Sequence, residues 1–304
     1  MLIYKILIFV PLIIFIISSI IINKEIKICL CTIGKDENRY AIEFIDYYKK
    51  HGVDKIFLYD NNQEEGERFE HILNEYIQNG FVEIIDLRGL ERAQIKEYQD
   101  CYKKNYKKYD WLIYVDMDEY IFLRNYYNIK NFLKRRTFNK CQRIQLNWIF
   151  HTDNDLLHYD NRSLFERFPE REIKARGKKK GGDQGIKSIL RGKIDVQIYD
   201  VHIISKNLTS CDGFGNIKEV QNIITNESDF YFNYIDHFYC KSTEEFINKL
   251  KKGSVSHGNN NTEHMLKRIN MYFSYNTVTE DKINYIERET KLDLSNYRNR
   301  IIKY

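Results

Sequence analysis

The residues with the clearest chemical potential are three carboxylates that follow one apolar segment. Residues 111–115 are mostly apolar, and Asp116, Asp118 and Glu119 come almost directly after them. A short apolar run between polar segments is typical of a buried strand in a parallel sheet. Carboxylates held a few ångströms apart raise one another's pKa, and a bound divalent cation relieves that repulsion. Their hard oxygen ligands suit Mg²⁺ or Mn²⁺.

Asp116 and Asp118 also have a spacing that lets two side chains face one ion. In an extended chain, residues two apart point the same way, so both carboxylates are expected to bind the same cation. Such an ion could hold a diphosphate. The alternative interpretation is an acidic turn in solvent after a strand, since Asp-x-Asp is short and common. The strands and helices expected around the motif decide which of the two interpretations is favoured.

The first half of the chain alternates apolar strand patterns with amphipathic helix patterns. Strands are expected at residues 26–33, 53–59, 81–86 and 111–115, and helices at residues 38–51, 69–78 and 94–108. This alternation predicts an α/β fold with a parallel, doubly wound sheet. Loops that follow successive strands gather at one edge of such a sheet. We therefore expect a nucleotide-sized site with a metal where three loops meet, at residues 32–37, 60–62 and 116–119.

Other cofactor and partner classes lack their usual signals. No G-x-G-x-x-G or Walker pattern occurs, which argues against a nicotinamide dinucleotide or a P-loop. The net charge of +5 over 304 residues is too small to indicate a nucleic-acid partner. The six cysteines show no C-x-x-C spacing, so structural zinc is not expected. Cys29 and Cys31 lie two apart in a strand pattern and are not expected to pair with each other.

The second half of the chain is less regular. Strand patterns occur at residues 142–150, 185–190 and 196–204, and residues 230–240 are rich in aromatic side chains. Ser242 and Glu245 have the spacing of a capping box, which predicts the start of a helix. Residues 262–289 have the pattern of further amphipathic helices.

The N-terminus has the character of a membrane anchor. No charged residue occurs from Ile6 to Ile22, a length at the lower edge of what spans a bilayer. No small-x-small cleavage motif follows, which favours an uncleaved signal anchor over a cleaved signal peptide. The predicted organisation is a transmembrane helix at residues 1–23, an α/β domain at residues 24–257 and a C-terminal helical extension at residues 258–304.

Several short motifs follow one another between residues 26 and 257. They are Lys35-Asp-Glu, Glu43-Phe44, His51-Gly-Val53, Tyr59-Asp-Asn61, Gln94…Tyr98…Cys101, Trp111…Asp116-Met-Asp-Glu-Tyr120, Trp148-Ile-Phe150, Lys187-Ser-Ile189, His202 and Asp236-His-Phe238…Lys241-Ser242…Glu245-Phe246. This ordered set resembles glycosyltransferase family 92, whose members have the GT-A fold. The chain departs from the family pattern at Asp36, Phe44, Phe238 and residues 151–155, where the family usually has Asn, Trp, Tyr and a Gly/Ser segment.

The resemblance implies a GT-A fold, which is a Rossmann-like, mixed and mostly parallel sheet with flanking helices. It implies an inverting transfer of a sugar from a UDP-sugar donor to a glycan acceptor, with Mn²⁺ or Mg²⁺ as cofactor. Galactose is the sugar that this family usually transfers. With the anchor, it implies a single-pass membrane protein, of the Golgi or ER type if the source is eukaryotic.

The resemblance and the sheet argument together assign roles to individual residues. Asp116, Asp118 and His237 are the expected metal ligands, and Asp118 is also counted as catalytic. Asp153 and Asp155 are proposed as the general base because they are acidic and follow the next strand. The expected contacts to the donor come from Thr32, Lys35, Asp60, Asn61, Gln94, Asp116, Trp148 and Lys187.

Two other functions fit part of this pattern. A phosphohydrolase of the haloacid dehalogenase type also places Asp-x-Asp after an apolar strand, but normally after the first strand and before Thr or Val. Here the motif follows the fourth expected strand and precedes Glu119-Tyr120. The second alternative is a membrane-tethered glycan-binding protein with an inactive transferase fold, which the intact Asp-x-Asp argues against.

Overall fold

The computed structural model describes residues 25–171, 185–202, 204–205, 207–218, 229–253 and 261–301. The predicted anchor at residues 1–23 lies outside these ranges. Within them, no helix combines the length and the apolar character that crossing a bilayer requires.

Four parallel strands form the first half of the central sheet, in the order β3-β2-β1-β4. Their bounds are β1 (Ile28–Gly34), β2 (Lys55–Asp60), β3 (Val82–Asp86) and β4 (Trp111–Tyr114). All four were predicted from the sequence. Every residue of β1 and β4 is buried, as expected for strands covered on both faces.

The sheet continues beyond β4 with mixed direction. Strand β7 (Ile186–Arg191) runs antiparallel to both β4 and β6 (Arg143–Phe150). Strand β10 (Asn233–His237) is parallel to β6 and antiparallel to β5 (Glu119–Leu123). Short strands β8 (Ser210–Cys211) and β9 (Ile217–Lys218) extend from β6. The sheet is therefore mixed, as the resemblance implied.

The strand expected at residues 196–204 is wrong. The chain turns back on itself there, because the Tyr199 N–H donates to the Ile204 carbonyl and the Ile204 N–H donates to the Asp200 carbonyl. The Asp200 carboxylate also accepts from the backbone N–H of His202 at 2.7 Å. A short polar side chain that bonds its own backbone in this way favours a turn over a strand.

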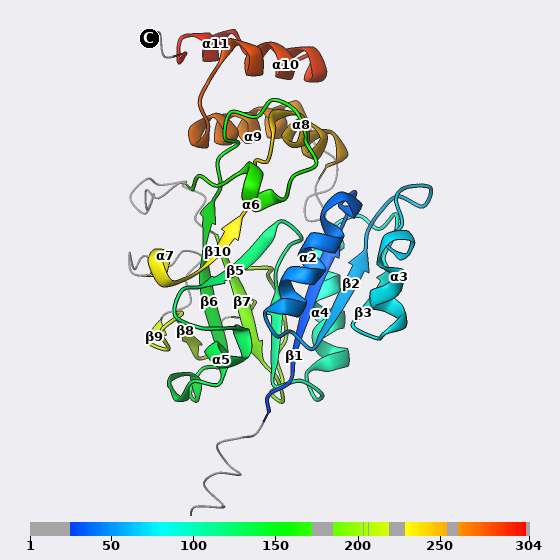
Figure 1. Cartoon of the computed structure of the whole chain (residues 1–304), viewed down its shortest axis with the longest axis vertical. Helices are drawn as coiled ribbons and strands as arrows, with labels where there is room; N and C mark the ends of the chain where they lie inside the picture. The colour runs from blue at the N-terminus through cyan, green and yellow to red at the C-terminus, as the bar shows by residue number, and fades with distance from the viewer. Residues whose placement is uncertain are drawn as a thin grey trace, which may run out of the picture.

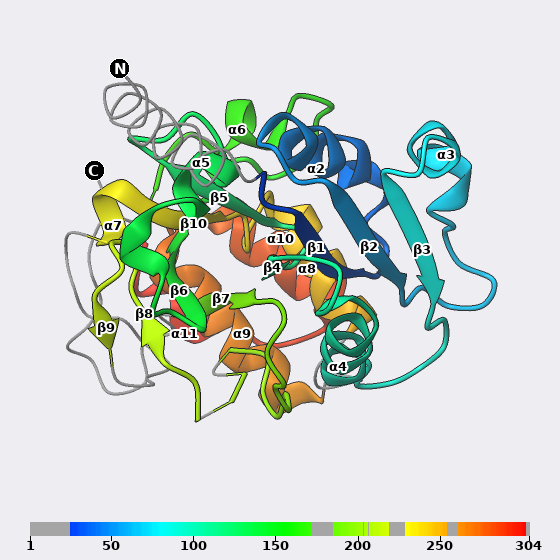
Figure 2. The ribbon, with the colours of Figure 1, turned by 90° about the horizontal axis from the view of Figure 1, so that it is seen from below.

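Helices cover both faces of the parallel strands. Helices α2 (Asn38–Lys50) and α3 (Glu70–Gln78) pack on one face, and α4 (Gln94–Asn105) packs on the other (Figures 1 and 2). Strand β1 serves both cores by alternation: Ile28 and Leu30 join the α2 side, whereas Cys29 and Cys31 join the α4 side.

A helical layer lies beyond the ends of β6 and β10 (Figure 1). It consists of α8 (Thr243–Lys252), α9 (Thr262–Tyr275), α10 (Glu280–Thr290) and α11 (Ser295–Arg298). Phe150 of β6 belongs to the same core cluster as Phe246, Ile269 and Ile283, so this layer packs directly on the sheet. Shorter helices are α5 (Ile129–Leu133), η1 (Arg136–Phe138), α6 (Leu164–Arg167) and α7 (Asp229–Phe232).

Two disulfides cross-link the fold. Cys31 of β1 bonds to Cys101 of α4, and Cys141 bonds to Cys211 of β8. Cys29 is a buried free thiol, in line with the expectation that it does not pair with Cys31.

Candidate active site

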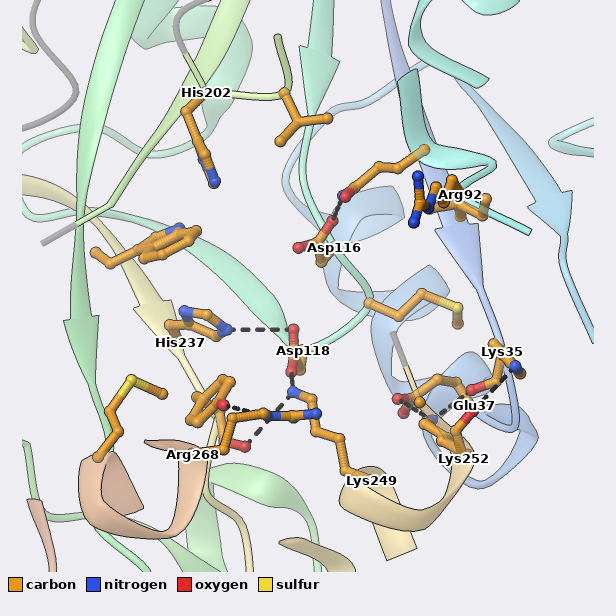
Figure 3. Close-up of a pocket in the computed structure, with 18 of the residues that line it drawn as sticks. Lys35, Glu37, Arg92, Asp116, Asp118, His202, His237, Lys249, Lys252 and Arg268 are labelled. Atoms are coloured by element: carbon orange, nitrogen blue, oxygen red, sulfur yellow. Dashed lines mark hydrogen bonds and ion pairs between the residues drawn. The ribbon is translucent and has the colours of Figure 1, made fainter. Parts of the chain in front are cut away.

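A cavity of about 850 Å³ opens where the carboxyl ends of β1, β4 and β10 face α8 and α9. Charged and polar side chains reach it from both the sheet and the helical layer (Figure 3). Those that line it include Lys35, Glu37, Arg92, Gln94, Asp116, Asp118, Trp148, Asp200, His202, His237, Lys249, Lys252, Lys267 and Arg268.

The close approach of the Asp-x-Asp segment to β1 depends on a glycine. A Cβ atom at Gly34 would lie 2.5 Å from the Met117 sulfur and 2.5 Å from the Phe69 ring. No side chain fits at that position without displacing them. Gly34 therefore lets Met117, the middle residue of the motif, pack over the end of β1 and line the cavity.

Asp116 and Asp118 both line this cavity, but they do not point at the same place (Figure 3). The segment after β4 is a turn, closed by the Glu119 N–H donating to the Asp116 carbonyl at 3.1 Å. The alternation argument is therefore wrong at this point, because it holds only for an extended chain. Each carboxylate has its own set of partners.

Asp118 lies with Glu119 and His237 in a group that could hold a metal ion. One ligand atom from each residue lies within 4.8 Å of the others, and all three residues are buried. In the part of the chain that the structure describes, Glu119 Oε1 and His237 Nδ1 have no hydrogen-bond partner. The two carboxylates suit either Mn²⁺ or Mg²⁺, whereas the imidazole favours Mn²⁺, because Mg²⁺ prefers oxygen ligands. The group contains Asp118 and His237, two of the three predicted metal ligands, together with Glu119, and it does not include Asp116. The metal-binding roles of these residues stay predictions.

The direction of His237 follows from the alternation of β10. His237 Nε2 faces Asp118 Oδ1 at 3.5 Å, whereas Asp236 points to the other face and binds His151 Nε2 at 2.7 Å. Burial lowers the pKa of His237 below its usual value, against the opposing effect of Asp118. The ring is therefore neutral at physiological pH, which is the form that binds metals.

Asp118 carries a negative charge that a lysine neutralises. Lys249 Nζ lies 2.5 Å from Asp118 Oδ2. Burial acts to raise the pKa of Asp118, but Lys249 and His237 outweigh it and hold this pKa well below its usual range. The carboxylate is thus ionised and ready to bind a cation.

Asp116 is held by residues of α4 and β7. Gln94 Nε2 donates to Asp116 Oδ1 at 2.7 Å, and Lys187 Nζ lies 2.9 Å from the same oxygen. Lys187 is buried beneath the cavity and does not line it. Burial acts to lower the pKa of Lys187, but Asp116 and Glu119 raise it well above its usual value, so the ammonium stays charged.

A second ion-pair group joins the loop after β1 to α8. Glu37 lies 3.1 Å from Lys241 Nζ and 3.0 Å from Lys252 Nζ, and Lys252 also donates to the Lys35 carbonyl. Lys35 Nζ donates in return to the Lys252 carbonyl at 3.1 Å. These contacts fix the edge of the cavity on the side of α2.

Besides Lys187, three predicted donor contacts do not line the cavity. Asp60 pairs with Arg88 at 2.7 Å, and the Asn61 amide donates to the Leu87 and Leu90 carbonyls. Thr32 is fully buried in β1, and its neighbour Ile33 lines the cavity instead. The loops do meet as expected, since the Asn61 N–H donates to the Gly34 carbonyl. The donor-binding roles of these three residues stay predictions.

Asp153 and Asp155 also lie outside the cavity lining. Both approach Lys282 of α10 at 2.7 Å, and Asp153 also accepts from the Tyr272 hydroxyl of α9. These contacts attach the helical layer to the sheet. The general-base role predicted for the two carboxylates stays a prediction, and their contacts are those of structural residues.

Sequence reasoning missed much of the cationic wall of the cavity. Lys249 and Lys252 lie three residues apart on α8, so helical spacing alone places them on one face. Arg268 follows on α9, and Arg92 precedes α4. The signal for the α8 pair was present in the capping box, which locates the helix and thus its faces.

A model of a known protein family matches most of the chain. The family model described as Glycosyltransferase family 92 matches residues 24–277, a range that includes α9. A family 92 protein of Oryza sativa subsp. japonica is 26% identical over 99 residues, and one of Ricinus communis is 24% identical over 115 residues. These alignments cover 33% and 38% of this chain, and 17% and 20% of those proteins.

Similarity to solved structures is low. The structure of S. aureus TarS 1-349 in complex with UDP-GlcNAc aligns with 90% of this chain and 85% of its own, at 13% identity and a TM-score of 0.35.

Proposed function

The chain belongs to glycosyltransferase family 92 and is a glycosyltransferase. From this premise we propose that it transfers a sugar from a UDP-sugar to a glycan acceptor. We propose further that the transfer inverts the anomeric configuration and requires bound Mn²⁺ or Mg²⁺. Galactose is the sugar we propose first. Family membership argues against the phosphohydrolase. An inactive transferase fold would share that membership, and the intact Asp-x-Asp argues against it.

The observation that carries this proposal is the position of the group formed by Asp118, Glu119 and His237. It lies at the wall of a cavity of about 850 Å³, a volume in the range of small-molecule sites. Ligands of open α/β sheets bind beyond the carboxyl ends of the strands. Among the described residues, the buried atoms Glu119 Oε1 and His237 Nδ1 have no hydrogen-bond partner and face each other at 3.9 Å, so a cation there would satisfy polar groups that make no hydrogen bond.

A bound divalent cation supplies Lewis-acid stabilisation of the diphosphate that leaves the sugar. Asp118 and His237 would hold that ion, and Glu119 is the third candidate ligand. Asp116 is fixed by Gln94 and Lys187 and remains partly exposed to the cavity. This supports a hydrogen bond to Asp116 from a hydroxyl group of the nucleotide-sugar. Trp148 lines the same cavity and offers an apolar ring to a sugar.

The membrane anchor and location remain part of the proposal. The two disulfides support an oxidising compartment, because such bonds persist in the secretory pathway and outside cells and are rare in the cytosol. We place the catalytic domain on that side of a membrane, attached through residues 1–23.

A thermal-shift experiment on the full-length protein tests this function. We expect UDP with Mn²⁺ to raise the melting temperature (Tm) more than either alone, because ligands that bind only the folded state stabilise it. GDP and ADP with Mn²⁺ are the matched controls. An equal response to all three diphosphates would contradict a uridine site, and a response to UDP that is the same in EDTA would contradict the metal. Turnover of UDP-galactose against UDP-glucose then tests the sugar.

A further inference from the structure

Lys249 occupies an unusual place for a lysine. Its ammonium group contacts Asp118, which belongs to the group of possible metal ligands, and it approaches the Tyr239 carbonyl at 3.5 Å. It also lies 4.4 Å from the centre of the Tyr239 ring. Its side chain is 21% exposed and lines the cavity, so the same ammonium faces both Asp118 and the space for a ligand (Figure 3).

A metal ion and this ammonium compete for one carboxylate. Asp118 Oδ2 accepts from Lys249 at 2.5 Å, and Asp118 Oδ1 faces His237 at 3.5 Å. A divalent cation bound by Asp118 and His237 would place like charges a few ångströms apart, which is unfavourable in a buried site. The ammonium must therefore leave Asp118 when the ion binds. Its four-carbon stem is flexible enough to do so.

Neighbouring cations are less able to move. Lys252 is held by Glu37 and by the Lys35 carbonyl, and Arg268 Nε donates to the Tyr239 hydroxyl at 3.0 Å. Lys249 is thus the lysine of α8 whose principal anion is the one that a metal ion would take. The nearest new anion would be the diphosphate of a bound donor, since α8 forms the wall of the same cavity.

We propose that Lys249 is a positioning residue that exchanges between two anions: it neutralises Asp118 in the metal-free enzyme and binds the donor diphosphate once a divalent cation has replaced it. This inference rests on the proposed function. Lys249 would therefore weaken the binding of the metal ion and strengthen the binding of the sugar donor.

The test measures Mn²⁺ binding and UDP binding separately in Lys249→Met. With the competing ammonium removed, the full-length protein should bind Mn²⁺ alone about tenfold more tightly, at the lower end of what close charge pairs contribute. At saturating Mn²⁺ it should bind UDP about tenfold more weakly, because the diphosphate loses a cation. Electron paramagnetic resonance of free Mn²⁺ and calorimetric titration with UDP give the two constants.

Two neighbours on α8 are matched controls. Lys251→Met removes an exposed lysine that pairs with Glu289 and should change neither constant. Lys252→Met removes a charge that lines the cavity but pairs with Glu37, so it should leave the affinity for Mn²⁺ within about twofold of wild type. Lys249→Gln, which can still donate a hydrogen bond to Asp118, is measured in parallel in case the apolar variant does not fold.

The outcomes separate this inference from the proposed function. A wild type that binds neither Mn²⁺ nor UDP overturns both. A wild type that binds both, with Lys249 variants whose Mn²⁺ affinity is unchanged or weaker, overturns the inference alone. If Lys249 were purely structural, its replacement would lower the affinities for Mn²⁺ and for UDP together. An equal gain in Mn²⁺ affinity in Lys252→Met would mean that general charge repulsion, not exchange at Asp118, controls metal binding.

Discussion

Replacement of Asp118 should lower both the rate of catalysis and the stability of the metal-free protein, and the two effects can be measured separately. Asp118→Asn keeps the size of the side chain but removes a charged ligand, and losing one electrostatic partner of a transition state costs about 10² to 10³ in rate. The variant should also melt earlier without metal, because Lys249 loses its partner in a largely buried pair. Turnover of UDP-sugar and melting with and without Mn²⁺ measure the two effects.

Asp46→Asn is a suitable control, because Asp46 accepts a hydrogen bond from Tyr76 at an exposed position of α2. It should change neither turnover nor the response to Mn²⁺. An Asp118→Asn protein that still gains stability from Mn²⁺ would contradict the assignment of Asp118 as a ligand.

Glu97 provides a test of pH dependence. It is fully buried on α4, and neither carboxylate oxygen has a partner among the residues that the structure describes. Burial, with repulsion from Asp116, raises its pKa well above the usual value. Folding therefore favours the protonated acid. Its contribution to the free energy of unfolding is complete below the unfolded pKa of about 4.3 and is lost as pH rises toward the folded pKa.

Glu97→Gln has the size of the neutral acid and does not titrate. Its Tm should therefore rise relative to that of wild type as the pH increases from about 4 to about 8. Thermal melts across this range measure the difference. A difference that stays constant with pH would mean that Glu97 does not titrate differently in the folded and unfolded states.

At the scale of elements, α8 is the helix that carries cations into the cavity, and its start is fixed by a capping box. The Ser242 hydroxyl and Glu245 form both reciprocal bonds, as the sequence predicted. Ser242→Ala should lower the free energy of unfolding by about 1 kcal/mol. Because Lys249 and Lys252 lie on this helix, the variant should also raise the KM for donor.

Helix α6 offers a matched control with the same motif. Ser163 and Glu166 form a capping box there, and no residue of α6 lines the cavity. Ser163→Ala should lower Tm to a similar extent and leave KM unchanged. Equal effects of the two variants on KM would show that α8 does not position donor-binding residues.

For the molecule as a whole, the disulfides are the strongest single constraints on the unfolded chain. Each closes a loop with a sequence separation of 70 residues. A loop of that length corresponds to about 4 kcal/mol in the chain-entropy account. Reduction should therefore lower Tm clearly, and Cys141→Ser with Cys211→Ser should remove part of this sensitivity. A Tm that is the same with and without dithiothreitol would contradict the contribution of the disulfides and weaken the case for an oxidising compartment.

Local periodicity was enough to predict the strands and helices in the first half of the central sheet. The alternation of β1 to β4 with α2 to α4 appears in the sequence as runs of apolar residues with periods of two and 3.6. The capping box of α8 is likewise a pattern of four neighbouring residues. The position of Asp116 to Glu119 after β4 follows from the same reasoning, and it places the motif at the edge of the sheet where ligands bind.

Only the tertiary structure decided which side chains meet within that edge. A one-turn departure from the extended chain separates Asp116 from Asp118, and the pairing of β10 with β5 and β6 brings His237 beside Asp118. Lys249 comes from a helix that docks through Phe246 and its neighbours. Contacts between residues far apart in the chain depend on how whole elements pack. Local sequence patterns describe the faces of single elements and carry no information about which faces finally meet.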